Sequence, residues 1–188
     1  MTIKVSAIEK IILYGDSLMA GYGLPKEQHL SVVLQDNLKL EGFNIEVING
    51  SVSGSTSSGG LNRAEWSLLE NNIDLMILCL GANDMLRGID PKETKNNLEK
   101  IIKIAQKKNI KIIIAGMIAP TSYGISYKKI FDKIFKDLSN QYNLQLIPFL
   151  LEGVAQKVEF NLSDGMHPND KGTIIISNTL KKAILENL

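Results

Sequence analysis

Residues 75–84 read LMILCLGAND, and this stretch does most to decide the fold. Its six apolar residues, 75–80, predict a β-strand, and the glycine after them predicts where the strand ends. Similar short runs rich in branched side chains predict four more strands, at residues 11–14, 45–48, 110–115 and 144–147. The run at 110–115 is apolar apart from Lys111, which is typical of a strand covered on both faces.

Amphipathic patterns between these strands predict helices. They cover residues 27–41, 61–70, a stretch beginning at 91, a stretch that follows a loop over 116–126 and runs to about 141, and 168–185. This alternation predicts an α/β fold: a three-layer α/β/α sandwich with a five-stranded parallel sheet in the flavodoxin-like order 2-1-3-4-5. No repeat or linker interrupts the pattern, so we expect residues 1–188 to form a single domain.

The helix expected from residue 91 has the clearest boundaries. Asp90 is a good N-cap, and Pro91 fits the first turn because its missing N–H would be unpaired there in any case. Four apolar residues at helical spacing are expected to form its buried stripe: Leu98, Ile101, Ile102 and Ala105.

Composition excludes several classes of protein. The 188 residues carry a net charge of +1 without a basic patch, so we expect no nucleic-acid partner. No stretch approaches the ~18 uninterrupted apolar residues of a membrane-spanning helix, so we expect no stable membrane insertion. Residues 1–10 lack the apolar core of a signal peptide, which predicts a cytoplasmic protein, with a periplasmic location as the alternative if a signal was removed. The sequence indicates no particular oligomeric state.

Cysteine and histidine are scarce. Cys79 is the single cysteine and lies in an apolar run, so we expect a buried, inert thiol and no intramolecular disulfide. The two histidines are His29 and His167, too few for a multi-histidine metal centre. We therefore expect no metal and no cofactor.

Four short polar segments follow the predicted strands or precede the last helix. They are residues 15–18 (GDSL), Gly54 within a Ser/Gly-rich loop, residues 81–84 (GAND) and residues 164–168 (DGMHP). In open parallel sheets, functional groups gather outside the carboxyl ends of the strands. We therefore expect these segments to meet at one edge of the sheet.

The side chains in these segments fit nucleophilic catalysis. A serine hydroxyl needs a base within hydrogen-bond reach, and His167 is the histidine placed in a strand-end loop. Asp164, three residues earlier, can hold the other imidazole nitrogen of His167. The N–H groups of Ser17 and Gly54 and the side-chain amide of Asn83 are suitable donors to an oxyanion.

The four segments, in this order, resemble the sequence blocks of the SGNH (GDSL) hydrolases, in particular the bacterial thioesterase I, lysophospholipase L1 and arylesterase group. The likeness covers nearly the whole chain and includes residues 21–22 (GY), 86–88 (LRG) and 120–124 (PTSYG). The resemblance implies an esterase or thioesterase that acts on small acyl substrates through an acyl-Ser17 intermediate. It also implies Ser17, Gly54, Asn83 and His167 as the name-giving residues, with Asp164 as the third triad member.

Two departures from the family pattern stand out. Ala82 occupies a position where many relatives have glycine, a mild change that should leave Asn83 in place. The loop over 116–126, which in the family helps to set acyl-chain preference, matches only loosely.

Two other functions remain as alternatives. One is a carbohydrate O-deacetylase of the same family, although the apolar loop 117–120 suits an acyl chain better. The other is a non-catalytic flavodoxin-like nucleotide-binding module. Against it, no G-x-G-x-x-G follows the first strand, and Asp16 places a carboxylate where a phosphate would sit.

Five conspicuous residues outside the proposed triad and oxyanion donors are expected to have structural roles or none. We expect Asp16 to fix its loop and Asp84 to bond nearby backbone. Tyr22 and Trp66 are expected to be packing residues, with Tyr22 bordering the substrate pocket. His29, expected near the start of the first helix, is assigned no role.

Overall fold

The sheet has the predicted topology. The computed structural model describes residues 8–69 and 72–188, and all adjacent strands pair in parallel in the order β2-β1-β3-β4-β5. The strands are β1 (Lys10–Gly15), β2 (Glu46–Asn49), β3 (Leu75–Cys79), β4 (Lys111–Ala115) and β5 (Gln145–Ile147). Because β1 lies between β2 and β3, the chain reverses its direction of progress across the sheet beside the carboxyl end of β1. This is the switch point at which such sheets place their sites.

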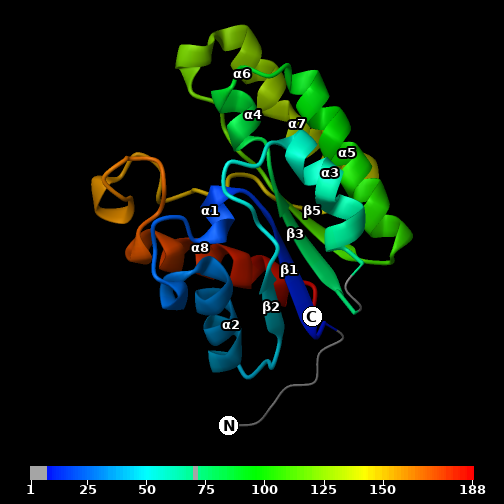
Figure 1. Ribbon diagram of the computed structural model, residues 1–188, viewed down its shortest axis with the longest axis vertical. Coiled ribbons are helices and arrows are strands. Elements are labelled where there is room, and N and C mark those ends of the chain that lie inside the picture. The colour runs from blue at the N-terminus through cyan, green and yellow to red at the C-terminus, as the bar shows by residue number, and fades with distance from the viewer. Residues whose placement is uncertain (1–7, 70–71) are drawn as a thin grey trace.

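Helices cover both faces of the sheet. The α-helices are α1 (Ser17–Ala20), α2 (Leu30–Leu40), α3 (Ser57–Ser67), α4 (Ala82–Leu86), α5 (Pro91–Lys107), α6 (Ile125–Phe131), α7 (Lys133–Tyr142) and α8 (Asp170–Leu185). Short 3₁₀ turns are η1 (Lys26–Gln28), η2 (Thr121–Tyr123) and η3 (Val158–Phe160). Helices α2 and α8 pack together on one face, and α5 packs with α3 and α7 on the other, which gives the predicted three layers (Figure 1).

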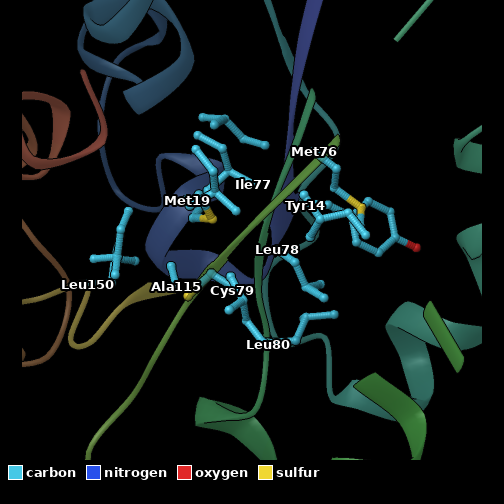
Figure 2. Packing of buried hydrophobic residues seen from close by; sticks show 14 of the residues in the cluster. Tyr14, Met19, Met76, Ile77, Leu78, Cys79, Leu80, Ala115 and Leu150 are labelled. Atoms are coloured by element: carbon cyan, nitrogen blue, oxygen red, sulfur yellow. The ribbon is translucent and has the colours of Figure 1, made fainter. Parts of the chain in front are cut away.

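The core is built on β3, whose residues are all buried. Successive side chains of a strand point to opposite faces, so Met76, Leu78 and Leu80 lie on one side, while Ile77 and Cys79 lie on the other (Figure 2). Because both faces of β3 are covered by helices, both sets of side chains find apolar neighbours.

Helix α5 follows its sequence signals. The Asp90 side chain accepts a hydrogen bond from Lys92 N at 2.9 Å, and Pro91 occupies the first turn. The four residues of its predicted stripe are fully buried against the core: Leu98, Ile101, Ile102 and Ala105. Both the N-cap and the buried face therefore stabilise this helix.

The predicted helix at 61–70 begins earlier, as α3 at Ser57. Thr56 caps it by accepting a hydrogen bond from Gly59 N at 3.1 Å. Its first turn is polar, so the apolar periodicity that begins at Leu61 could not reveal it. Residue 70, the expected end, lies outside the described residues, as do residues 1–7 of the segment examined for a signal peptide.

The predicted helix at 27–41 is also wrong in its first turn. Residues 26–28 form η1, and His29 is an extended N-cap before α2. His29 is half-buried, and its Nε2 lies 3.1 Å from the Leu24 carbonyl oxygen. Its ring packs so closely on Gly21 that no side chain would fit there. His29 therefore has a structural role that the sequence did not suggest.

Three further boundaries differ from the predictions. The helix expected to run to about 141 is divided at Asp132 into α6 and α7. The last helix begins at Asp170, two residues later than expected, because Asn169 caps it by accepting from Gly172 N at 3.0 Å. The short helices α1 and α4 were not predicted, since neither is long enough to show a period.

Candidate active site

Ser17 lies at the tight corner between β1 and α1. Asp16 is the N-cap of α1, and its Oδ1 accepts a hydrogen bond from Leu18 N at 3.1 Å. Helix α1 is only four residues long and ends at Gly21, whose φ of 84° requires glycine. The fully buried Met19 anchors α1 to the core, so the half-buried Ser17 is held where β1 leaves the sheet.

His167 is presented by a turn that the sequence builds locally. Asp164 Oδ1 accepts hydrogen bonds from Met166 N at 2.9 Å and His167 N at 3.0 Å. Gly165 adopts a φ of 70° between them, and Leu162 N donates to the His167 carbonyl oxygen at 2.7 Å. Asp164 therefore fixes the backbone of the same histidine whose ring it bonds.

The structure brings Ser17, His167 and Asp164 into one hydrogen-bonded line. Ser17 Oγ lies 2.9 Å from His167 Nε2, and His167 Nδ1 lies 2.7 Å from Asp164 Oδ2. The N–H donors of His167 and Met166 hold the pKa of Asp164 at about 2, so this carboxylate is ionised and only accepts. Nδ1 must then carry the imidazole proton, which leaves Nε2 free to accept the proton of Ser17.

Tyr22 covers the imidazole. Its ring centroid lies 4.3 Å from that of His167, with the planes tilted by 35°. Tyr22 is 51% exposed, so it borders the site as expected but is not a packing residue of the core. Trp66, 76% exposed, was likewise wrongly expected to be a packing residue.

Asn83 lies in α4, immediately after β3. Its Nδ2 donates to Asp16 Oδ2 at 3.3 Å and to the Ser55 carbonyl oxygen at 3.2 Å. From the same helix, Arg87 donates to the Gly54 carbonyl oxygen at 3.0 Å. Gly54 has a φ of 76°. These bonds bring the three strand-end segments that carry Ser17, Gly54 and Asn83 together at the carboxyl edge of the sheet.

Asp16 is a buried carboxylate between Ser17 and Asn83. It is fully inaccessible to solvent, and this burial raises its pKa to about 6 against the opposing hydrogen bonds from Leu18 and Asn83. Its role in fixing the loop is confirmed by its N-cap bond. A buried carboxylate at the start of a four-residue helix also disfavours a phosphate there, which counts against a nucleotide-binding module.

Asp84 confirms its expected structural role. It is buried and accepts hydrogen bonds from Ser57 N at 2.7 Å, from the Ser57 hydroxyl, and from Thr94 Oγ1 at 3.1 Å. Asp84 thereby ties together α3, α4 and α5 beneath the site. Cys79 is also buried, as expected, and burial raises the pKa of its thiol.

A groove of about 710 Å³ lies beside the hydrogen-bonded line of Ser17, His167 and Asp164. The neighbours of three site residues open onto it: Leu18 next to Ser17, Ala82 next to Asn83, and Met166 next to His167. Most other lining side chains are apolar, among them Met85, Met117, Ile118, Phe149 and Leu151. Most of the lining residues belong to α1, α4, the loop after β4 and the segment that precedes α8, which is orange in Figure 1.

The segment between β5 and the His167 turn was not predicted to contribute to the site. It supplies groove residues 149–157 and is held by the buried Asn161, whose Nδ2 donates to the carbonyl oxygens of Val154 at 2.8 Å and Lys157 at 2.7 Å. Asn169 then donates to the Glu159 carbonyl oxygen at 3.0 Å. The one available signal was Asn169 itself, a good N-cap residue before an apolar run.

Two searches of the described part of the chain bear on other functions. Within residues 8–69 and 72–188, no group of three or more His, Cys, Asp or Glu side chains is placed to hold a metal ion. Over the same ranges, no helix has the length and hydropathy needed to cross a bilayer.

Comparison with known proteins identifies the family. The GDSL-like lipase/acylhydrolase family model matches residues 13–173. An arylesterase of Vibrio mimicus is 36% identical over 97% of this chain and 91% of its own length, and the thioesterase 1/protease 1/lysophospholipase L1 of Escherichia coli K12 is 29% identical over 98% and 87%. The crystal structure of the psychrotrophic esterase EstA from Pseudoalteromonas sp., inhibited by monoethylphosphonate, superimposes with a TM-score of 0.89 at 33% identity, over 95% of this chain and 97% of that one. The resemblance expected from the sequence is confirmed: the chain belongs to the GDSL-like lipase/acylhydrolase family and is a carboxylic ester hydrolase.

Proposed function

We propose that Ser17 is the nucleophile and His167 the general base and acid. Asp164 orients the imidazole and stabilises the positive charge that it gains when it takes the serine proton. The observation that carries this proposal is the continuous line from Ser17 Oγ through His167 to Asp164, at 2.9 Å and 2.7 Å. Each distance is short enough for direct proton transfer or charge-assisted hydrogen bonding. Ser17 and His167 are 150 positions apart in the sequence and meet at one site, which supports one catalytic domain over residues 1–188.

In the acylation step, Ser17 Oγ attacks the substrate carbonyl carbon as His167 Nε2 takes the hydroxyl proton. The carbonyl oxygen becomes an oxyanion, for which the proposed donors are Ser17 N–H, Gly54 N–H and Asn83 Nδ2. Asn83 would exchange one of its two long bonds, to Asp16 Oδ2 at 3.3 Å or to the Ser55 carbonyl oxygen at 3.2 Å, for the oxyanion. The imidazolium, stabilised by the ionised Asp164, then gives its proton to the leaving alcohol or thiol. The bond to the leaving group breaks, and an acyl ester on Ser17 remains.

In the deacylation step, His167 takes a proton from water, and the resulting hydroxyl attacks the acyl carbon. The second oxyanion collapses by expelling Ser17 Oγ, which regains its proton from the imidazolium. The product is a free carboxylic acid, and Ser17 and His167 have regained their starting protonation states, with a proton from water replacing the one that left with the alcohol or thiol. The same constellation needs no proton donor outside these residues and water.

We further propose that the acyl group of the substrate is an apolar chain, carried on an alcohol or a thiol. The support is the groove beside Ser17, whose volume of about 710 Å³ and apolar lining suit a hydrocarbon chain. Relatives named arylesterase and thioesterase 1 act on both kinds of leaving group by name. Phe149 is the one aromatic side chain among the described residues that line the groove, and the other large side chains there are mostly aliphatic, so we favour an acyl esterase over a carbohydrate O-deacetylase.

A hydrolysis panel tests the proposal. It compares p-nitrophenyl esters and acyl-CoA thioesters from two to sixteen carbons with an acetylated sugar, for the wild-type protein and Ser17→Ala. We expect hydrolysis of esters and thioesters with a preference for chains longer than acetyl, and none by Ser17→Ala. Ser58→Ala, an exposed serine of the neighbouring α3, is the matched control and should keep wild-type rates. A preference for the acetylated sugar would instead establish the deacetylase.

A further inference from the structure

One wall of the groove is held by an ion pair between Lys128, which itself lines the groove, and Asp132. Lys128 Nζ lies 2.6 Å from Asp132 Oδ2, one helical turn apart at the end of α6. Both charged groups also bond the backbone of Ala119. Lys128 Nζ donates to the Ala119 carbonyl oxygen at 2.7 Å, and the Ala119 N–H donates to Asp132 Oδ1 at 2.8 Å. The backbone N–H and carbonyl oxygen of Ala119 are thus both hydrogen-bonded to charged side chains.

Asp132 lies at the junction of two helices. Asp132 is both the last cap of α6 and the residue before α7, with φ −62° and ψ −22°. A continuous helix would have been compatible with the sequence periodicity, yet the chain divides at the residue whose carboxylate reaches the loop. The division of the helix and the bond to Ala119 therefore belong to one local arrangement.

The wall itself consists of Met117 and Ile118, which lie between two anchors. On one side, Gly116 N donates to the Ile147 carbonyl oxygen at 2.8 Å, and Leu150 N donates to the Gly116 carbonyl oxygen at 3.0 Å. On the other side, the Ala119 backbone is hydrogen-bonded to Lys128 and Asp132. Met117 is buried and Ile118 is 43% exposed, and both line the groove. With regular structure absent from residues 116–120, these two anchors define where the wall stands.

We propose that the Lys128–Asp132 pair is a specificity determinant: it fixes the wall formed by Met117 and Ile118 and thereby sets the preference for long acyl chains. The proposal rests on the proposed function, because it assumes that the acyl chain occupies this groove. A wall already in place need not be ordered when the chain binds, so its fixation lowers the cost of binding long chains. An acetyl group does not reach the wall and gains nothing from it.

This mechanism predicts an effect on KM rather than on the chemical step. Releasing the wall should raise KM for a ten-carbon ester, while kcat for that ester and all constants for the acetate ester stay near wild type. The ion pair alone is half-exposed, at 29% and 30% of the two side chains, and pairs of this kind contribute little by themselves. The bonds to Ala119 are therefore the contacts that matter.

The experiment compares p-nitrophenyl decanoate with p-nitrophenyl acetate for Asp132→Ala, Asp132→Asn and Lys128→Met. Lys129→Met, an exposed lysine next to Lys128 on the same helix, is the matched control. We expect the ratio of kcat/KM for decanoate over acetate to fall roughly tenfold in Asp132→Ala and Lys128→Met. Asp132→Asn, which can still accept from Ala119 N, should lose less, and Lys129→Met nothing. Hydrogen exchange at the Ala119 amide should accelerate in Asp132→Ala only.

An unchanged or increased ratio in both Asp132→Ala and Lys128→Met would overturn the proposal, as would an equal fall in Lys129→Met. A fall in kcat for both esters alike would indicate damage to the whole site and would also contradict it. The acetate reaction separates the two proposals. If the wild-type protein hydrolyses the acetate ester through Ser17 but the decanoate-to-acetate ratio is unchanged in Asp132→Ala and Lys128→Met, only the specificity assignment fails. If acetate hydrolysis survives Ser17→Ala, the proposed function fails first.

Discussion

The proposed catalytic edge, which carries Ser17, Asn83 and His167, and the groove proposed for the acyl chain lie side by side but are stabilised in different ways. Ser17 and Asn83 lie in the first turns of short helices that follow central strands, and the His167 turn is closed by its own Asp164. The groove walls, residues 116–120 and 149–157, are loops held by side-chain bonds from elsewhere, such as those of Asp132 and Asn161. The proposed catalytic side chains are thus positioned by strand ends and one local turn, whereas the shape of the groove depends on a few replaceable side chains.

This contrast predicts that substitutions at the catalytic edge change the rate of reaction for every substrate. The largest effect is expected for Ser17→Ala and His167→Ala. Each should lower kcat by about 10⁴–10⁶-fold, because the nucleophile and base act as a unit. The two losses should not add in the double variant. Steady-state hydrolysis of p-nitrophenyl butyrate provides the measurement, and additive losses would show that the two side chains act separately.

Asn83→Ala should have the next largest effect. If Asn83 Nδ2 donates to the oxyanion, its removal should lower kcat by roughly 10²–10³-fold with little change in KM. Asn97→Ala is a useful comparison, since Asn97 also donates through Nδ2, to Ser57 Oγ, but lies in α5 away from Ser17. Equal losses in the two variants would mean that Asn83 serves the packing of this edge and not the oxyanion.

Asp16 should make the stability of the catalytic edge depend on pH. Burial raises its folded-state pKa to about 6, above the ordinary aspartate value of 3.8, so folding favours the protonated acid. The stabilisation is complete below pH 3.8 and is lost as pH rises through about 6. Relative to Asp16→Asn, the wild-type unfolding free energy should fall by about 2–3 kcal/mol across this range. Asp164, with a pKa of about 2, stays ionised throughout and does not interfere.

Chemical denaturation at pH 4, 5, 6 and 7 measures this difference. A flat difference between the wild-type protein and Asp16→Asn would contradict the raised pKa. Asn is chosen because its side-chain oxygen can still cap α1, so that loss of the cap does not confuse the result.

A substitution in the groove should alter selectivity and leave the chemistry intact. Ala155 is half-buried and lines the groove, so Ala155→Trp should fill part of the space for the acyl chain. We expect kcat/KM for a decanoate ester to fall about tenfold while the acetate ester changes less than about twofold. A parallel loss on both esters would show that the groove and the catalytic edge are not independent.

The sequence predicted the catalytic edge better than the groove for a physical reason. The strands, their order and α5 have strong local signals, and Ser17, Asn83 and His167 follow directly from strand ends and one Asx turn. The polar first turn of α3, the division at Asp132 and the extended His29 carry no hydrophobic period. Each is decided by a side-chain bond to a distant residue or by close packing. The segment 149–157 is likewise placed by Asn161, whose amide partners could not be assigned from spacing.

The measurement that tests the central claim most directly is covalent labelling with a fluorophosphonate, followed by mass mapping of the modified peptide. We expect one phosphonyl group on Ser17. Pre-incubation with a slow ester substrate should prevent this labelling, and His167→Ala should not be labelled on the same timescale. Labelling of another serine, such as one of those in residues 51–58, or unchanged labelling in His167→Ala, would contradict it.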